Sequence, residues 1–178
     1  CTNNRNCRSY KYKCCTAQHI TENAVEYCNK NCVYTESEII ARNEIHMEHY
    51  CKVIAIEGET LVDMVQHGIL NAVSEYTAAL SETLIKKRKA LPEVPCRVES
   101  ALIGTLSSLN ESLLDKMVSL KSALETAPSV GSAELMKYYH DEVFLKMEDM
   151  RAVIDKLETL VAGDYWPYPR YTDLLFSV

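Results

Sequence analysis

Two long stretches of apolar residues with helical spacing, separated by a short turn, most constrain the fold of this 178-residue chain. In both stretches an apolar side chain recurs every three or four residues, the spacing that places side chains on one face of a helix. The first stretch covers about residues 94–126, the second about residues 132–162, and Ala127-Pro128-Ser129-Val130-Gly131 lies between them. So short a turn between stripes of similar length predicts an antiparallel helical hairpin in preference to an intermolecular coiled coil.

A third helical pattern, from Glu36 to about Leu91, is longer than either arm of the hairpin. It follows Thr35, whose hydroxyl can accept from a backbone N–H of the first turn while the carboxylate of Glu38 reaches back to the cap. An unbroken helix of this span would be roughly 80 Å long. We therefore expect a break or kink near Gly58 or Gly68, where helix propensity is lowest.

Local signals predict where the other helices begin and end. Pro92 and Pro95 separate the long pattern from the first arm of the hairpin. Ser132 is a good N-cap for the second arm, and Gly163 is suited to the position just after its last turn. A short helix is expected over about residues 21–31. No alternating strand pattern occurs, so the predicted fold class is all-α: a long helix plus an antiparallel helical hairpin, forming a bundle.

The N-terminal residues differ from the helices. Residues 1–19 are polar and basic, lack any helix or strand period, and hold four of the eight cysteines. We expect them to form a disordered lead-in to a helical domain over residues 20–178. The cysteine density is low for a disulfide-built scaffold, so free thiols in a reducing cytoplasm are expected. Because the first residue is not Met, we also expect a fragment or a processed product.

The C-terminal tail, which begins at Asp164, is rich in aromatic residues. Pro167 and Pro169 forbid a regular helix there. A segment this aromatic is expected to pack as an extended strap on the helices or on a neighbouring subunit. The predicted packing and assembly residues are Trp166, Pro167, Tyr171, Leu174, Leu175 and Phe176.

Motifs for catalysis are missing from the sequence. It has no Gly-rich phosphate loop, no Gly-x-Ser-x-Gly and no His-Glu-x-x-His. Its closest approach to a metal site is the cluster Glu44, His46, Glu48 and His49, with Cys51 next to it. Two histidines rarely bind a metal without further converging ligands, so a solvated or partly buried helix face is the preferred interpretation. We therefore predict no catalytic, cofactor-binding or metal-binding residue in this chain.

Charge and hydropathy exclude two classes of partner. The net charge is −6 and most basic residues are interspersed with acidic ones, unlike the basic face of a nucleic-acid-binding protein. The short basic run at residues 86–89 is interpreted as a solvated helix end, where cations are favourable. No apolar stretch approaches the roughly 20 residues that span a bilayer. We expect neither a nucleic acid nor a membrane as partner.

Two stretches resemble the C-terminal region of type III glutamine synthetases. The first is Val33-Tyr34-Thr35-Glu36-Ser37-Glu38, continued by Ala41-Arg42-Asn43-Glu44-Ile45 and by residues 50–57. The second runs from residues 150–158 to the ending Trp166-Pro167 … Tyr171-Thr172-Asp173-Leu174-Leu175-Phe176, and it is the more specific of the two. With the helices between them, the resemblance covers about residues 20–178.

This resemblance implies a place in a large, oligomeric, cytoplasmic ligase of nitrogen metabolism that joins ammonia to glutamate, using ATP and Mg²⁺ or Mn²⁺. In that family the glutamate, ATP and metal sites lie on a β-rich core whose motifs do not occur in this chain. The resemblance therefore implies a structural or assembly part that is inactive alone. Its implied partners are the catalytic core of the same enzyme and the neighbouring subunits of a homo-oligomer.

Two alternatives remain open from the sequence. Complete helix caps and a self-sufficient hairpin also suit a stand-alone helical protein-interaction module, which would bind a partner through an apolar groove. A redox or metal sensor would depend on the N-terminal cysteines and on the pair His46 and His49.

Overall fold

The computed structural model describes Glu26, Cys28, Lys30, Asn31, residues 33–169, Asp173 and Leu175. The regular elements named for these residues are all helical, and they are α3 (Glu36–Met64), η1 (Val65–Ile69), α4 (Leu70–Ala90), α5 (Arg97–Glu125), α6 (Ser132–Tyr138), η2 (Tyr139–Phe144) and α7 (Leu145–Leu160), where η1 and η2 are π-helical turns. The prediction of an all-α fold is therefore confirmed.

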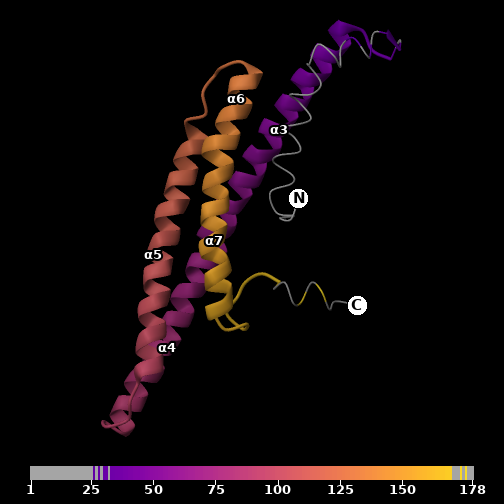
Figure 1. Ribbon diagram of the computed structural model, residues 1–178. Helices are drawn as coiled ribbons and strands as arrows, with labels where there is room; N and C mark the ends of the chain where they lie inside the picture. The colour runs from indigo at the N-terminus through magenta and orange to yellow at the C-terminus, as the bar shows by residue number, and fades with distance from the viewer. Residues whose placement is uncertain are drawn as a thin grey trace.

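The helices form one long rod with a hairpin against it (Figure 1). Here "rod" means α3, η1 and α4, which follow one another directly along the chain. α5 returns along the rod, and α6, η2 and α7 run back beside α5 (Figure 1). α5 packs most extensively on α7 and α4, while α6 packs on α3. The predicted long helix with an antiparallel hairpin is the observed architecture.

The expected break in the long helix takes the form of a π-helical turn that contains Gly68. Within it the N–H of Leu70 donates to the carbonyl of Val65, the i to i+5 pattern of a π-helix. The α-helical hydrogen bonding is thus interrupted near Gly68 as expected, although the helical path continues from α3 through η1 into α4. α5, α6 and η2 pack on the rod along its length.

Gly58 lies inside regular α3 and serves packing rather than bending. A Cβ atom at this position would lie 3.2 and 3.3 Å from the two terminal methyl carbons of Leu124, and 3.6 Å from the sulfur of Met147. The missing side chain therefore lets α3 approach α5 and α7 closely.

The N-terminal cap of the long helix forms as predicted. The backbone N–H of Thr35 donates to Oε2 of Glu38 at 2.8 Å, and the N–H of Glu38 donates to Oγ1 of Thr35 at 3.4 Å. The bond from the Thr35 N–H holds the pKa of the Glu38 carboxyl below its ordinary value, and a second bond to this carboxylate, donated by the Thr35 hydroxyl at 2.8 Å, adds to the shift. Two N–H groups that the helix itself cannot satisfy are thereby paired.

Two other helix ends differ from the prediction. Ser132 is the first residue of α6 rather than its cap, and Gly131 occupies the cap position without a side-chain hydrogen bond. α7 ends at Leu160 because Val161 adopts an extended conformation, so the chain leaves the helix before it reaches Gly163.

The predictions for the two ends of the chain fall largely on residues that are not described. The expected lead-in over residues 1–19 lies wholly outside the described residues. In the expected helix over residues 21–31, Glu26, Cys28 and Lys30 are helical. None of the described helices is both long and apolar enough to cross a membrane.

The core runs along the inside of the rod and the hairpin. Its largest fully buried side chains come from η1, α4, α5, η2 and α7, and α3 adds the buried Tyr50, Ile54 and Val62. The fully buried ones are Leu106, Leu113, Leu120, Met150, Leu157, Val65, Val73 and Val143. Full burial of one such side chain contributes about 1.5–3 kcal/mol relative to leaving it exposed. The core therefore holds the hairpin against both halves of the rod.

Candidate packing and assembly site

The residues that follow α7 pack back onto the rod. We call residues 161–169 the strap. It begins at the extended Val161 and turns through two backbone hydrogen bonds, from the N–H of Tyr165 to the carbonyl of Ala162 at 3.0 Å and from the N–H of Trp166 to the carbonyl of Gly163 at 3.2 Å. This turn directs the indole of Trp166 into the main hydrophobic core, where the residue is 9% exposed.

Two tyrosines of the strap contact the rod on either side of Trp166. The ring of Tyr165 lies against the ring of Tyr76, with centroids 5.3 Å apart and planes tilted by 50°. The hydroxyl of Tyr168 donates to the backbone carbonyl of Met64 at 3.1 Å. Burial raises the pKa of Tyr168, and the negative charge of Asp63 adds to this shift. The strap is therefore fastened to the rod at the π-helical turn.

Gly68 makes room for this contact. A Cβ atom at residue 68 would lie 2.5 Å from the hydroxyl oxygen of Tyr168 and 3.0 Å from two of its ring carbons. Real Cβ atoms essentially never approach other atoms so closely, so the phenol fits only where residue 68 has no side chain.

The predicted assembly residues fall into two groups. Trp166 is buried in the core, whereas Pro167 is exposed and Leu175 is 57% exposed. Tyr171, Leu174 and Phe176 lie outside the described residues, so their burial stays a prediction. Sequence reasoning missed Tyr168 and Gly68 as contact partners, because the tail showed its aromatic character but not which turn of the rod it would cross.

The residues considered as metal ligands do not converge. Glu44, His46, Glu48 and His49 are exposed along α3. In the described part of the chain, no group of three or more His, Cys, Asp or Glu side chains could hold a metal ion. These residues therefore do not fit a metal or ATP–metal site, and burial raises the pKa of the nearby Cys51, which disfavours its reactive thiolate.

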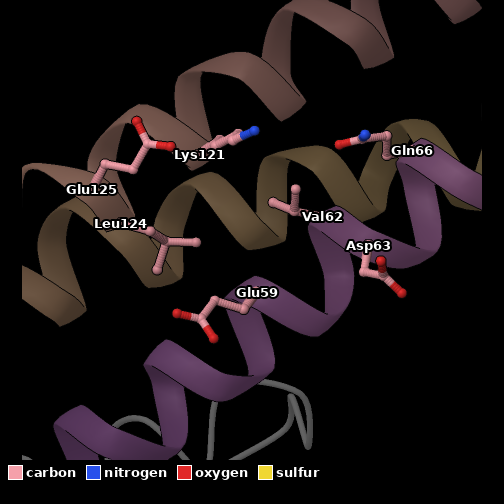
Figure 2. Close-up of a pocket in the computed structure, with 7 residues that line it drawn as sticks. All are labelled: Glu59, Val62, Asp63, Gln66, Lys121, Leu124 and Glu125. Atoms are coloured by element: carbon pink, nitrogen blue, oxygen red, sulfur yellow. The ribbon is translucent and has the colours of Figure 1, made fainter.

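A hollow of about 360 Å³ lies between the rod and α5 (Figure 2). Glu59, Asp63 and Gln66 line it from the rod, and Lys121 and Glu125 line it from α5, with Val62 and Leu124 as its apolar part. Three carboxylates against one ammonium give the hollow an excess of negative charge. None of these lining residues carries a hydroxyl, a thiol or an imidazole.

Comparison with known proteins identifies relatives along most of the chain. Residues 5–88 match the family model described as the glutamine synthetase C-terminal domain. The match begins at residue 5, so the resemblance extends further toward the N-terminus than the predicted residues 20–178.

Three relatives extend the similarity beyond that match. A glutamine synthetase of Butyrivibrio fibrisolvens is 29% identical over 168 residues, covering 92% of this chain and 24% of the relative. A glutamine synthetase of Bacteroides fragilis (strain YCH46) is 26% identical over 150 residues, which cover 82% of this chain and 21% of the relative. The type-3 glutamine synthetase of Dictyostelium discoideum is 25% identical over 162 residues, which cover 88% of this chain and 22% of the relative.

The chain thus spans less than a quarter of the length of each of these relatives. The resemblance seen in the sequence is confirmed by the family match and by the relatives' names together. This chain is therefore similar to the C-terminal domain of glutamine synthetases, a type-3 member among them.

Proposed function

We propose that this chain is the helical assembly part of an ATP-dependent enzyme that makes glutamine from glutamate and ammonia. In this proposal the chain packs on the catalytic core of the same enzyme and on neighbouring subunits, in the cytoplasm. The single observation that carries it is the match of residues 5–88 to the glutamine synthetase C-terminal domain.

The exposed apolar residues support a packing role. Ile45, Ile56 and Val98 are 64%, 63% and 68% exposed, and further large apolar side chains are exposed elsewhere on the helices. Single exposed apolar residues are common, but a surface with many of them is typical of protein interfaces. An enzyme core and neighbouring subunits would cover this surface.

ATP and Mg²⁺ or Mn²⁺ belong to the catalytic core in this proposal. This division is supported by the exposed and dispersed positions of His46 and His49, and by the lack of a metal-holding group among the described residues. The contribution of the chain is therefore to hold other parts of the enzyme in place, and we assign it no chemical step.

The test is an activity measurement on the native protein. An antibody raised against residues 132–178 would be used to isolate the native protein under non-denaturing conditions, and the 178-residue chain would be purified separately. We expect the native protein to form glutamine only when glutamate, ammonia, ATP and Mg²⁺ are all present, and the separate chain to form none. If the isolated native protein forms no glutamine with all four components present, the proposal is contradicted.

A second function, a stand-alone helical interaction module, is favoured by one observation. The core is closed by residues of this chain alone, with Leu106, Leu113 and Leu157 completely buried. This alternative predicts a cooperative thermal unfolding transition and a defined small size for the separate chain. A separate chain that is molten, or that aggregates through its tail, would exclude it.

A further inference from the structure

The connection between α4 and α5 forms a basic and apolar projection. α4 and α5 also form a helical hairpin with each other, and we call the residues that join them, 85–98, the hairpin tip. It extends beyond the end of α7 (Figure 1). Four large apolar side chains are exposed on it, namely Ile85, Leu91, Val94 and Val98 at 52%, 62%, 40% and 68%. Such a cluster at the end of a hairpin exceeds what a solvated helix end requires.

The charges of the hairpin tip are only partly neutralised within the chain. Lys86 pairs with Glu82 at 2.8 Å, and Lys87 pairs with Glu99. Arg88, Lys89 and Arg97 are exposed and form no ion pair with any described residue. The tip thus combines unneutralised positive charge with exposed apolar surface, although the whole chain carries a net charge of −6.

The hollow between the rod and α5 has the opposite character. It is concave, its apolar part is formed by Val62 and Leu124, and carboxylates of Glu59, Asp63 and Glu125 surround it (Figure 2). Glu59 and Glu125 form no ion pair with a described residue, so both are free to accept a cation from outside.

The hairpin tip cannot reach the hollow of its own chain. Asp63 and Lys86 lie on the same rod, and 23 residues of helix separate them by roughly 35 Å. Packing of the rod against α5 fixes this separation. The complementary partner of each surface must therefore belong to another molecule.

We propose that the hairpin tip of one copy of this chain docks into the acidic hollow of a second copy. Arg88 and Lys89 approach Glu59 and Glu125, while exposed apolar residues of the tip cover Val62 and Leu124. Because the two surfaces differ, the contact is heterologous, that is, head to tail. Repeating it generates a ring if the rotation that relates neighbouring copies closes, and an open array if it does not. The inference deepens the proposed assembly role by naming the partner as a second copy.

Charge exchange tests this contact directly. The 178-residue chain and its variants would be followed by sedimentation velocity over a range of concentrations in low and high salt. We expect the wild-type chain to associate, and to do so less in high salt because exposed charges are screened. R88E/K89E and E59K/E125K should each weaken association by about tenfold or more, since like charges then face each other. An equimolar mixture of the two variants should associate again.

Two further variants control for a general effect of net charge and for unfolding of the charge-reversed variant. K137E/K156E changes the net charge as much as R88E/K89E does, but at exposed positions on α6 and α7, and should associate like the wild type. R88Q/K89Q removes the tip charges without reversing them, and it replaces the reversed variant where circular dichroism shows that the latter is unfolded.

Three results would overturn the proposal: a wild-type chain that stays monomeric, association that neither variant weakens, or a mixture that does not recover. Monomers that bind phosphatidylserine vesicles through Arg88 and Lys89 would overturn it as well, because the tip would then serve anionic lipid. All these results are independent of the glutamine-forming activity of the native protein. Failure of this inference is therefore distinguishable from failure of the proposed function.

Discussion

The phenol of Tyr168 lies directly over Gly68, at a turn where the long helix changes to π-helical hydrogen bonding. Its hydroxyl donates to the carbonyl of Met64, 104 residues earlier in the chain. The strap, the π-helical turn and the missing side chain at residue 68 therefore act as one unit. This unit is continuous with Trp166, whose indole lies in the core.

Replacing Gly68 tests this unit most simply. In Gly68→Ala the new Cβ would lie 2.5 Å from the hydroxyl of Tyr168, and we expect a loss of about 1–3 kcal/mol in the free energy of unfolding from overpacking. Gly104→Ala is the matched control, because a Cβ on this α5 residue meets nothing within 4 Å. It should stabilise the chain by about 1 kcal/mol through helix propensity. Urea denaturation of both variants checks the contrast, and equal effects would contradict it.

Removing the hydroxyl of Tyr168 tests the hydrogen bond to Met64. Tyr168→Phe should cost about 0.5–1.5 kcal/mol. Because burial raises the pKa of Tyr168 above its ordinary 10.0, the folded state favours the protonated phenol. The stability from this group is therefore complete below pH 10 and falls as the pH rises through the raised pKa. Denaturation curves at neutral and alkaline pH should show the difference between wild type and Tyr168→Phe shrinking, and a constant difference would argue against the assignment.

Trp166 is the anchor whose removal should be most costly. Its indole is buried in the core, so Trp166→Ala should lower the free energy of unfolding by about 3–5 kcal/mol. Pro167→Ala, at the exposed next position, is the control and should change it by about 0.5 kcal/mol or less. Circular dichroism in denaturant avoids reliance on the fluorescence of the removed residue. A loss below about 1 kcal/mol for Trp166→Ala would contradict its role.

The cap of the long helix gives a prediction about stability at acidic pH. Thr35→Ala removes the hydroxyl that accepts the N–H of Glu38 and should cost about 0.5–2 kcal/mol. The lowered pKa of Glu38 means that its stabilising effect is present above pH 4.5 and disappears as the pH falls through the lowered value. In Glu38→Gln the free energy of unfolding should therefore depend less on pH in this acidic range. An unchanged acid profile in Glu38→Gln would show that the carboxylate does not contribute.

The sequence was sufficient to predict the helices and their mutual packing. The stripes containing Leu106, Leu113 and Leu157 have one period and one turn between them, so local pattern determines both the elements and the faces that they bury. The cap at Thr35 was predictable for the same reason, since its partners are three residues apart.

Features that depend on distant contacts were not predictable. A glycine in a helix indicates weakness or close approach, and only the structure shows that Gly58 faces Leu124 while Gly68 faces Tyr168. The interruption expected near Gly68 is present as a π-helical turn, but local helix propensity could not show that the helical path continues through it, with α5 and α6 packed on the rod. The hollow between Glu59 and Glu125 likewise joins residues that are far apart in the sequence.

The central claim, that this helical chain works as part of a glutamine synthetase, is tested most directly by the size of the native polypeptide. Extract of the source cells would be separated under denaturing conditions and blotted with the antibody against residues 132–178. We predict a band about four times larger than the 20.2 kDa of this chain, because the chain covers 21–24% of its relatives. A band near 20 kDa, with no larger one, would contradict the claim and indicate a free-standing module.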